Sequence, residues 1–151
     1  LNHPGGATGY RLEHGGSSVA YLTDNEPYQT GVTPTGALQP TGASDRDDQE
    51  LVAFLREADV VVMDAQYDRE DYLEHLGWGH GCVDDVVRIA CEAKVGRLYL
   101  FHHDPEHDDD RMDRIVAEAR RIAKGYGGAT DVRAASEGEE WVLSEAMAEA
   151  R

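Results

Sequence analysis

The sequence predicts a layered α/β fold in which a mixed sheet is flanked by helices. Two short, fully apolar runs, at residues 60–63 and 98–101, suit strands that are buried on both faces of a sheet. Segments with apolar residues at helical spacing precede and follow these runs, and such alternation is typical of α/β layers. The chain has 151 residues, of which 40% are hydrophobic, and this is enough for one domain with a core of its own.

The N-terminal part of the chain predicts a β-hairpin and then a long loop. Residues 8–13 and 17–23 flank a Gly15-Gly16 turn and alternate weakly, which is typical of a hairpin. Residues 27–48 are rich in Gly, Thr and Pro, so we expect a surface loop there that can act as a lid. Apolar residues at helical spacing then predict a helix over 51–58.

The rest of the chain predicts two more helices and closing strands. Apolar residues at helical spacing indicate helices over 83–90 and 112–123, and acidic residues near the start of each suit the helix dipole. Gly125, Gly127 and Gly128 end the second of these helices. Residues 131–135 and 140–143 are expected to add closing strands.

Composition and charge limit the function classes. The net charge of −16 argues against a broad nucleic-acid surface, because such a surface needs Lys and Arg to displace counterions. No apolar run approaches the roughly 18 residues of a membrane span, and the first residues do not form a signal peptide. Cys82 and Cys91 would face different sides of a helix, so we expect no disulfide and a cytoplasmic protein.

Polar residues that can do chemistry follow the predicted strands. Asp24 follows the hairpin, Asp64 ends the first apolar run and His102 follows the second, so we expect them to meet at strand ends. His3 precedes a Pro-Gly-Gly turn that can hold its ring rigidly. Imidazole and carboxylate groups are common metal ligands, so these positions indicate a metal site. The alternative is that each residue caps a backbone group or satisfies a polar position in the core.

The remaining histidines give no such signal. His14 lies in a turn, His75 at a helix end and His107 among acidic residues at a helix start, and we expect all three at the surface. The sequence contains neither a CxxC nor an HExxH pattern, so the metal hypothesis depends on position along the chain and not on spacing.

Five segments of the chain, residues 3–14, 19–24, 60–67, 79–82 and 97–105, together resemble the ribonuclease Z-like proteins of the metallo-β-lactamase superfamily. Residues 3–14 resemble the segment of that family in which a His precedes a Gly-Tyr-Arg strand, and residues 19–24 resemble the strand that ends in its metal-bridging Asp. Residues 60–67 resemble its apolar strand that ends in an acidic residue. Residues 79–82 are similar to its Gly-His-Ser-Thr segment, and residues 97–105 to its last metal-ligand strand. These segments follow one another in the order that the family has.

The resemblance implies a metal-dependent hydrolase of phosphodiesters with two divalent metal ions, of which zinc is the first expectation and manganese or iron the others. His3 is then expected to bind one ion and Asp24 to bridge both. His102, rather than His103, is expected to bind the second ion, because the family strand aligns on His102.

The same resemblance implies that His80 and Asp64 form a proton-transfer pair, in which His80 gives a proton to the leaving oxygen and Asp64 orients it. Gly81 and Cys82 depart from the family, which has small hydroxyl residues at these positions. The basic arm that ribonuclease Z uses for transfer RNA has no counterpart in the sequence. A small phosphodiester or nucleotide is therefore the expected substrate.

The resemblance finally implies that residues 1–151 are the C-terminal half of an αββα sandwich. The N-terminal half, with the family motif His-x-His-x-Asp-His, is not in the sequence, so we expect this chain alone to be inactive. A missing N-terminal half or a homodimer mate is expected to cover the open face of the sheet. The alternatives are a non-catalytic or vestigial half-domain that acts as a dimerising module, and a receiver-like regulatory domain.

Overall fold

A five-stranded mixed sheet organises the part of the chain that the computed structural model describes, which is residues 1–26, 28, 31–32, 38–39 and 44–143. β1 is antiparallel to β2, and the remaining neighbours in the sheet are parallel. The predicted α/β class with a mixed sheet is therefore confirmed. In spatial order the strands are β1 (Tyr10–His14), β2 (Ser17–Leu22), β5 (Val60–Asp64), β6 (Arg97–Phe101) and β7 (Asp131–Ala134).

The predicted hairpin is formed by β1 and β2. Its tight turn pairs His14 with Ser17 and places Gly15 and Gly16 at φ values of 58° and 80°. Two successive residues with positive φ are what a type I′ turn requires, and glycine adopts this backbone without steric cost. The Gly-Gly pair in the sequence thus fixes the register of the hairpin.

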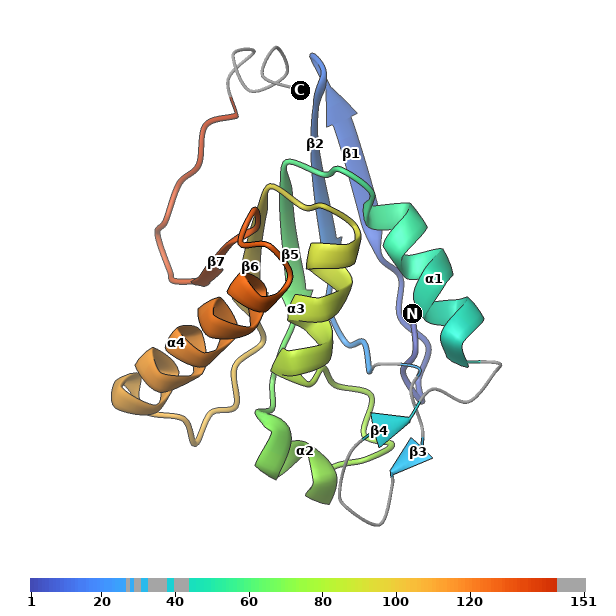
Figure 1. Ribbon diagram of the computed structural model, residues 1–151, viewed down its shortest axis with the longest axis vertical. Helices are drawn as coiled ribbons and strands as arrows, with labels where there is room; N and C mark the ends of the chain where they lie inside the picture. The colour runs from blue at the N-terminus through green and yellow to red at the C-terminus, as the bar shows by residue number, and fades with distance from the viewer. Residues whose placement is uncertain (27, 29–30, 33–37, 40–43, 144–151) are drawn as a thin grey trace.

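Helices α1 (Ser44–Leu55), α3 (Val83–Glu92) and α4 (Asp109–Gly125) cover one face of the sheet (Figure 1). Alternate strand residues point at these helices, and Leu22, Met63 and Leu100 are fully buried in the resulting core. Each such side chain contributes about 1.5–3 kcal/mol of hydrophobic free energy. Among the described residues, no helix combines the length and the apolar character that crossing a bilayer requires.

The segment predicted as a loop over residues 27–48 contains two short strands and the start of a helix. The two-residue strands β3 (Gly31–Val32) and β4 (Leu38–Gln39) pair within it, and α1 already begins at Ser44. The sequence pattern misses this helix start because the first residues of α1, Ser-Asp-Arg-Asp-Asp, include no apolar residue. Residues 27, 29–30, 33–37 and 40–43 lie outside the described residues, so the lid expected there stays a prediction.

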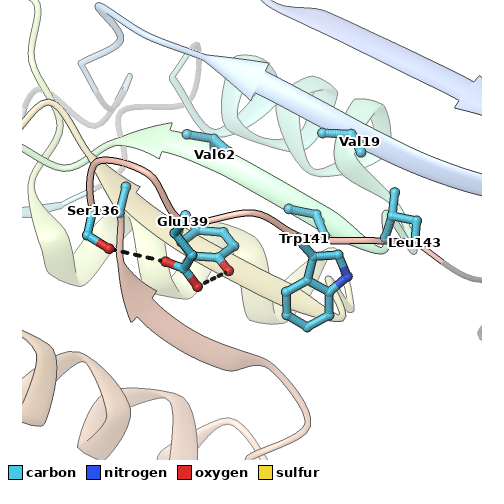
Figure 2. A pocket seen from close by; sticks show the side chains of 9 residues that line it. Val19, Val62, Ser136, Glu139, Trp141 and Leu143 are labelled. Atoms are coloured by element: carbon cyan, nitrogen blue, oxygen red, sulfur yellow. Dashed lines mark hydrogen bonds between the residues drawn. The ribbon is translucent and has the colours of Figure 1, made fainter.

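Two other elements differ from the expectation. The short helix α2 (Arg69–Glu74) was not predicted, because six residues are too few for an apolar periodicity to show. Its start is fixed by Asp68, whose side chain accepts hydrogen bonds from the backbone N–H groups of Glu70 and Asp71. Residues 140–143 are not a strand. After β7 the chain turns at Gly138 (φ 78°) and runs across the sheet instead of pairing at its edge (Figure 2).

The face of the sheet away from the helices is apolar and only partly covered. Residues 135–143 cross it and line, with Val19, Val62 and Tyr99, an open pocket of about 270 Å³ (Figure 2). The Tyr99 hydroxyl donates a hydrogen bond to Glu139 Oε1 at 2.8 Å and fastens this segment. Nearer the β1 edge the same face presents exposed side chains. These are Tyr10, Leu12 and Tyr21.

Candidate metal centre

Polar side chains from three parallel strands meet beyond the carboxyl ends of those strands. Asp24 follows β2, Asp64 ends β5 and His102 follows β6, and the register holds these strand ends side by side. His80, from the loop before α3, joins them. One ligand atom from each of these residues lies within 4.8 Å of the others. The convergence that the sequence predicts for the strand ends is therefore present in the fold.

The Asp64 side chain is fully buried, and protein hydrogen bonds occupy both of its oxygens. Oδ1 accepts from the backbone N–H groups of Gln66 (3.2 Å) and Gly81 (3.1 Å). Oδ2 accepts from the backbone N–H of Asn25 at 3.3 Å and contacts the His80 ring. A carboxylate held in this way is fixed in orientation and has little capacity left for a metal ion. Its surroundings favour a role in orienting its neighbours.

His80 is held by Asp64 through one ring nitrogen. His80 Nδ1 lies 2.9 Å from Asp64 Oδ2, so Nδ1 carries the proton and donates it to the ionised carboxylate. The other nitrogen, Nε2, takes no part in this contact. The ring lies 4.9 Å from the ring of His102 and 5.7 Å from that of His3, measured between centroids.

Asp24 and His102 have the left-handed backbone that side chains other than glycine rarely adopt. Their φ values are 55° and 60°. Each such residue costs about 1–3 kcal/mol of conformational free energy, and the surrounding structure has to supply it. Residues of this kind gather at functional sites, where the unusual backbone aims a side chain that a regular strand end would direct elsewhere. His102 Nδ1 lies 3.4 Å from Asp64 Oδ2, at the long limit of a hydrogen bond.

His3 lies beside this cluster and not within it. Its backbone carbonyl closes a tight turn by accepting from the N–H of Gly6 at 2.9 Å, and its Nδ1 accepts from the N–H of Gly5 at 3.1 Å. The ring is wedged against Gly79, where an added Cβ would come within 2.3 Å of its Cδ2. His3 is therefore held rigidly, as the sequence leads us to expect. Metal binding through Nδ1 would replace the contact with Gly5.

Sequence reasoning missed Glu26, a buried carboxylate beneath the site. Its Oε1 accepts from the hydroxyl of Tyr72 (3.0 Å) and the N–H of Gly77 (2.8 Å), and its Oε2 accepts from the N–H of Gly79 (2.9 Å). Burial and this carboxylate raise the pKa of Tyr72 far above its usual range, so the phenol stays a donor. Glu26 thereby fixes the loop that precedes His80. Its place two residues after Asp24 was the only available signal.

Two other histidines lie deeper than their sequence context indicates. The His107 side chain is 2% exposed and its Nε2 contacts Asp71 Oδ2 at 3.1 Å, so the expected surface position is wrong. The contact comes from α2, a helix that the sequence pattern did not predict. His103, next to His102, is half-buried, and this burial lowers the pKa of its ring. A neutral His103 adds no positive charge beside the cluster.

The chemistry of the cluster fits a divalent metal ion. It combines carboxylate oxygens with imidazole nitrogens, a donor set that suits zinc, manganese and iron. Asp64 lies at the edge of the candidate site and contacts the rings of His80 and His102. A carboxylate is a usual partner of a metal-binding histidine, because it holds the ring in place. Asp24, with two oxygens and no regular strand pairing, is suited to contact more than one ion.

Comparisons with known proteins find a matching family and similar relatives. A family described as "Beta-lactamase superfamily domain" matches residues 1–103. The ribonuclease Z of Thermoplasma acidophilum is 34% identical over 71 residues, which are 47% of this chain and 22% of that protein. The ribonuclease Z of Picrophilus torridus is 28% identical over 94 residues, which are 61% of this chain and 29% of that protein.

A solved structure shows the same fold. The metallo-β-lactamase fold protein YhfI from Bacillus subtilis superposes with a TM-score of 0.66 at 22% identity, over 92% of this chain and 45% of that one. The chain thus spans about a quarter of the curated relatives that it matches, and under half of this structural neighbour.

Proposed function

Because the match over residues 1–103 shows that this chain belongs to the β-lactamase superfamily, we propose that it supplies half of a dinuclear metal site that hydrolyses phosphodiester bonds. The observation that carries the proposal is the cluster of Asp24, Asp64, His80 and His102 beyond neighbouring strand ends. The relatives named ribonuclease Z support a metal-dependent hydrolase that acts on nucleic acid or its components.

We assign the metal-binding role to three residues. Asp24 would contact two ions, His102 would hold one of them and His3 the other, together with ligands from outside this chain. The positive φ values of Asp24 and His102 support this division, because strained backbone is retained where a side chain must point at a site. When bound, the ions would lower the pKa of a water molecule and neutralise charge on the phosphate. Zinc is the first candidate, and manganese or iron are the others.

We assign proton transfer to His80 and Asp64. Asp64 accepts the Nδ1 proton of His80 and so sets the tautomer and the orientation of the ring. In the doubly protonated ring His80 Nε2 carries a second proton, which it can give to the leaving oxygen, and the ring then returns to the neutral form with its proton on Nδ1. The backbone N–H of Gly81 on Asp64 Oδ1 keeps the carboxylate in place, so the pair acts as one unit.

The proposed substrate is a small phosphodiester or a nucleotide. The net charge of −16 does not support a long cationic track along a nucleic acid. A small substrate can be held by the metal ions and by neutral contacts near the cluster. This substrate class is narrower than the nucleic acids that the ribonuclease Z relatives suggest. The choice of the narrower class depends on the net charge of this chain.

The proposed domain organisation follows from the uncovered face of the sheet. Helices cover one face, whereas the other exposes apolar side chains around Tyr10, Leu12 and Tyr21. We propose that the N-terminal half of a sandwich covers this face and brings the His-x-His-x-Asp-His motif. A homodimer mate is the alternative, and it would correspond to a vestigial half-domain that acts as a dimerising module.

We also propose that the protein acts in the cytoplasm. Cys82 is buried and Cys91 partly buried, and both thiols are free. Unpaired thiols are the normal state in a reducing compartment.

Metal content and hydrolysis test the proposal together. The full-length protein that contains this chain should be purified without chelator, analysed for metals, and assayed with bis(p-nitrophenyl) phosphate before and after EDTA treatment. Near-stoichiometric zinc, manganese or iron, with turnover that EDTA abolishes and added metal restores, is expected. A metal-free, inactive protein with a dimeric mass would overturn the proposal and would favour the vestigial half-domain that acts as a dimerising module.

A further inference from the structure

Trp78 combines strong exposure with a rigid backbone. Its side chain is 59% exposed, although tryptophan usually contributes to a core or an interface. It lies two residues before His80, in a loop whose flanking glycines, Gly77 and Gly79, have φ values of 84° and 93°. These values require glycine on both sides of the indole. The loop is therefore built to present this one large side chain at a defined place.

The rigidity of the loop comes from Glu26. The N–H groups of Gly77 and Gly79 donate to opposite oxygens of this buried carboxylate, at 2.8 and 2.9 Å. The N–H of Trp78 donates to the carbonyl of His75 at 3.1 Å. Three successive backbone N–H groups are thus bound, and the indole has little freedom beyond its own side-chain torsions.

A row of rings connects the indole to the candidate metal centre. The Trp78 ring stands edge-on to His75, with 4.7 Å between centroids, and His75 stacks on Tyr67 at 4.4 Å with an interplanar angle of 10°. Tyr67 in turn contacts His80 with 6.3 Å between centroids. His75 Nδ1 lies 2.7 Å from the carbonyl of Asp71, so it must be the donor, and this bond fixes the ring beneath the indole.

We propose that the exposed indole of Trp78 is a stacking platform for a nucleobase of the substrate. The inference rests on the proposed function, because it places the base beside a phosphate bound at the metal centre. Stacking on an aromatic face is neutral and accepts every base, so it can hold a nucleotide on a chain with a net charge of −16. Because the backbone of this loop is already fixed, stacking a ring on the indole orders little more than the side chain of Trp78.

Two product-like ligands isolate the contribution of the base. Adenosine monophosphate and ribose 5-phosphate share the sugar and the phosphate, and a hydroxyl group takes the place of the base in ribose 5-phosphate. Their dissociation constants should be measured by calorimetry on the full-length, metal-loaded protein. We expect adenosine monophosphate to bind about tenfold more tightly, which is the order of one base–aromatic stack. Trp78→Ala should reduce this ratio to about one, whereas Trp78→Phe should keep most of it.

Leu76→Ala is the matched control, because Leu76 is 40% exposed on the same loop and carries no ring. It should leave the ratio unchanged. Equal affinities for the two ligands in the wild-type protein, or an unchanged ratio in Trp78→Ala, would overturn the inference. So would a Trp78→Ala protein that changes from dimer to monomer, since a second copy would then cover the indole.

Adenosine without phosphate separates this inference from the proposed function. If neither phosphate ligand binds in a metal-dependent way, the proposed phosphodiester site fails. Adenosine contacts seen by saturation-transfer NMR in the wild-type protein, and lost in Trp78→Ala, would still support the stacking platform. The absence of such contacts in the wild-type protein would overturn the platform as well.

Discussion

Replacing Glu26 by glutamine should loosen the loop before His80 while keeping nearly the same volume. Glutamine has one acceptor oxygen where glutamate has two. Its oxygen will face Tyr72 and Gly77, the two donors on Oε1, and its NH₂ group will then oppose the N–H of Gly79. One charge-assisted hydrogen bond is lost and one buried N–H is left without an acceptor.

The expected cost is about 1.5–3 kcal/mol in the free energy of unfolding, the usual range for a hydrogen bond to a charged group. At roughly 2–4 °C per kcal/mol for a domain of 150–250 residues, the melting temperature should fall by about 3–12 °C. Gly79 supports the ring of His3, so activity should fall by more than the loss of folded protein explains.

Calorimetry and denaturant titration of the full-length protein would measure this change. Tyr72→Phe is the matched control, because it removes one donor from Glu26 and leaves both glycine contacts in place. Its cost should be smaller than that of Glu26→Gln, because it removes one hydrogen bond to the carboxylate but leaves no buried N–H group without an acceptor. If the free energy of unfolding of Glu26→Gln equals that of the wild-type protein, or exceeds that of Tyr72→Phe, then Glu26 does not hold the loop before His80.

Two more predictions follow from close packing and from burial beside the site. Gly81→Ala should lower stability by about 1–3 kcal/mol and reduce turnover, because the new Cβ would lie 2.1 Å from the backbone oxygen of Asp64; full stability in denaturant titrations would contradict this. Burial raises the pKa of the Cys82 thiol to about 12, so Cys82 should not react with Ellman's reagent at pH 8 until the protein unfolds. Rapid labelling of Cys82 itself in the native protein, as distinct from the partly buried Cys91, would contradict this burial. The Cys82 thiol ionises near pH 9 in the unfolded chain but only near pH 12 in the folded protein. The contribution of Cys82 to the free energy of unfolding should therefore fall as the pH rises from about 9 to 12. In Cys82→Ala, the free energy of unfolding should fall less steeply over this pH range.

Much of the fold could be predicted because local patterns determine it. The Gly15-Gly16 turn, the apolar run of β5 and the stripe of α4 each carry their own signal, and the structure contains all of them. The start of α1 and the path of residues 140–143 carry no such signal. The start of α1 has only polar residues, and the path of residues 140–143 is decided by packing across the sheet.

The candidate site divides in the same way. Asp24, Asp64 and His102 could be found because each follows a strand, and parallel strands bring their ends together. Glu26 could not be found, since its partners lie about fifty residues away in the loop before His80. The burial of His107 was missed for a similar reason, because its partner Asp71 lies on a helix that the sequence did not predict.

The assigned roles of Asp24 and His80 are tested most directly by comparing Asp24→Ala with His80→Ala in the full-length protein. Metal content per chain and phosphodiester turnover should be measured on the same samples. Asp24→Ala should lose metal and turnover together, because its carboxylate is assigned to both ions. His80→Ala should keep its metal and lose turnover, because His80 is assigned to proton transfer and is held by Asp64 at 2.9 Å. Full metal content in Asp24→Ala, or loss of metal in His80→Ala, would contradict the division of roles on which the proposed function depends.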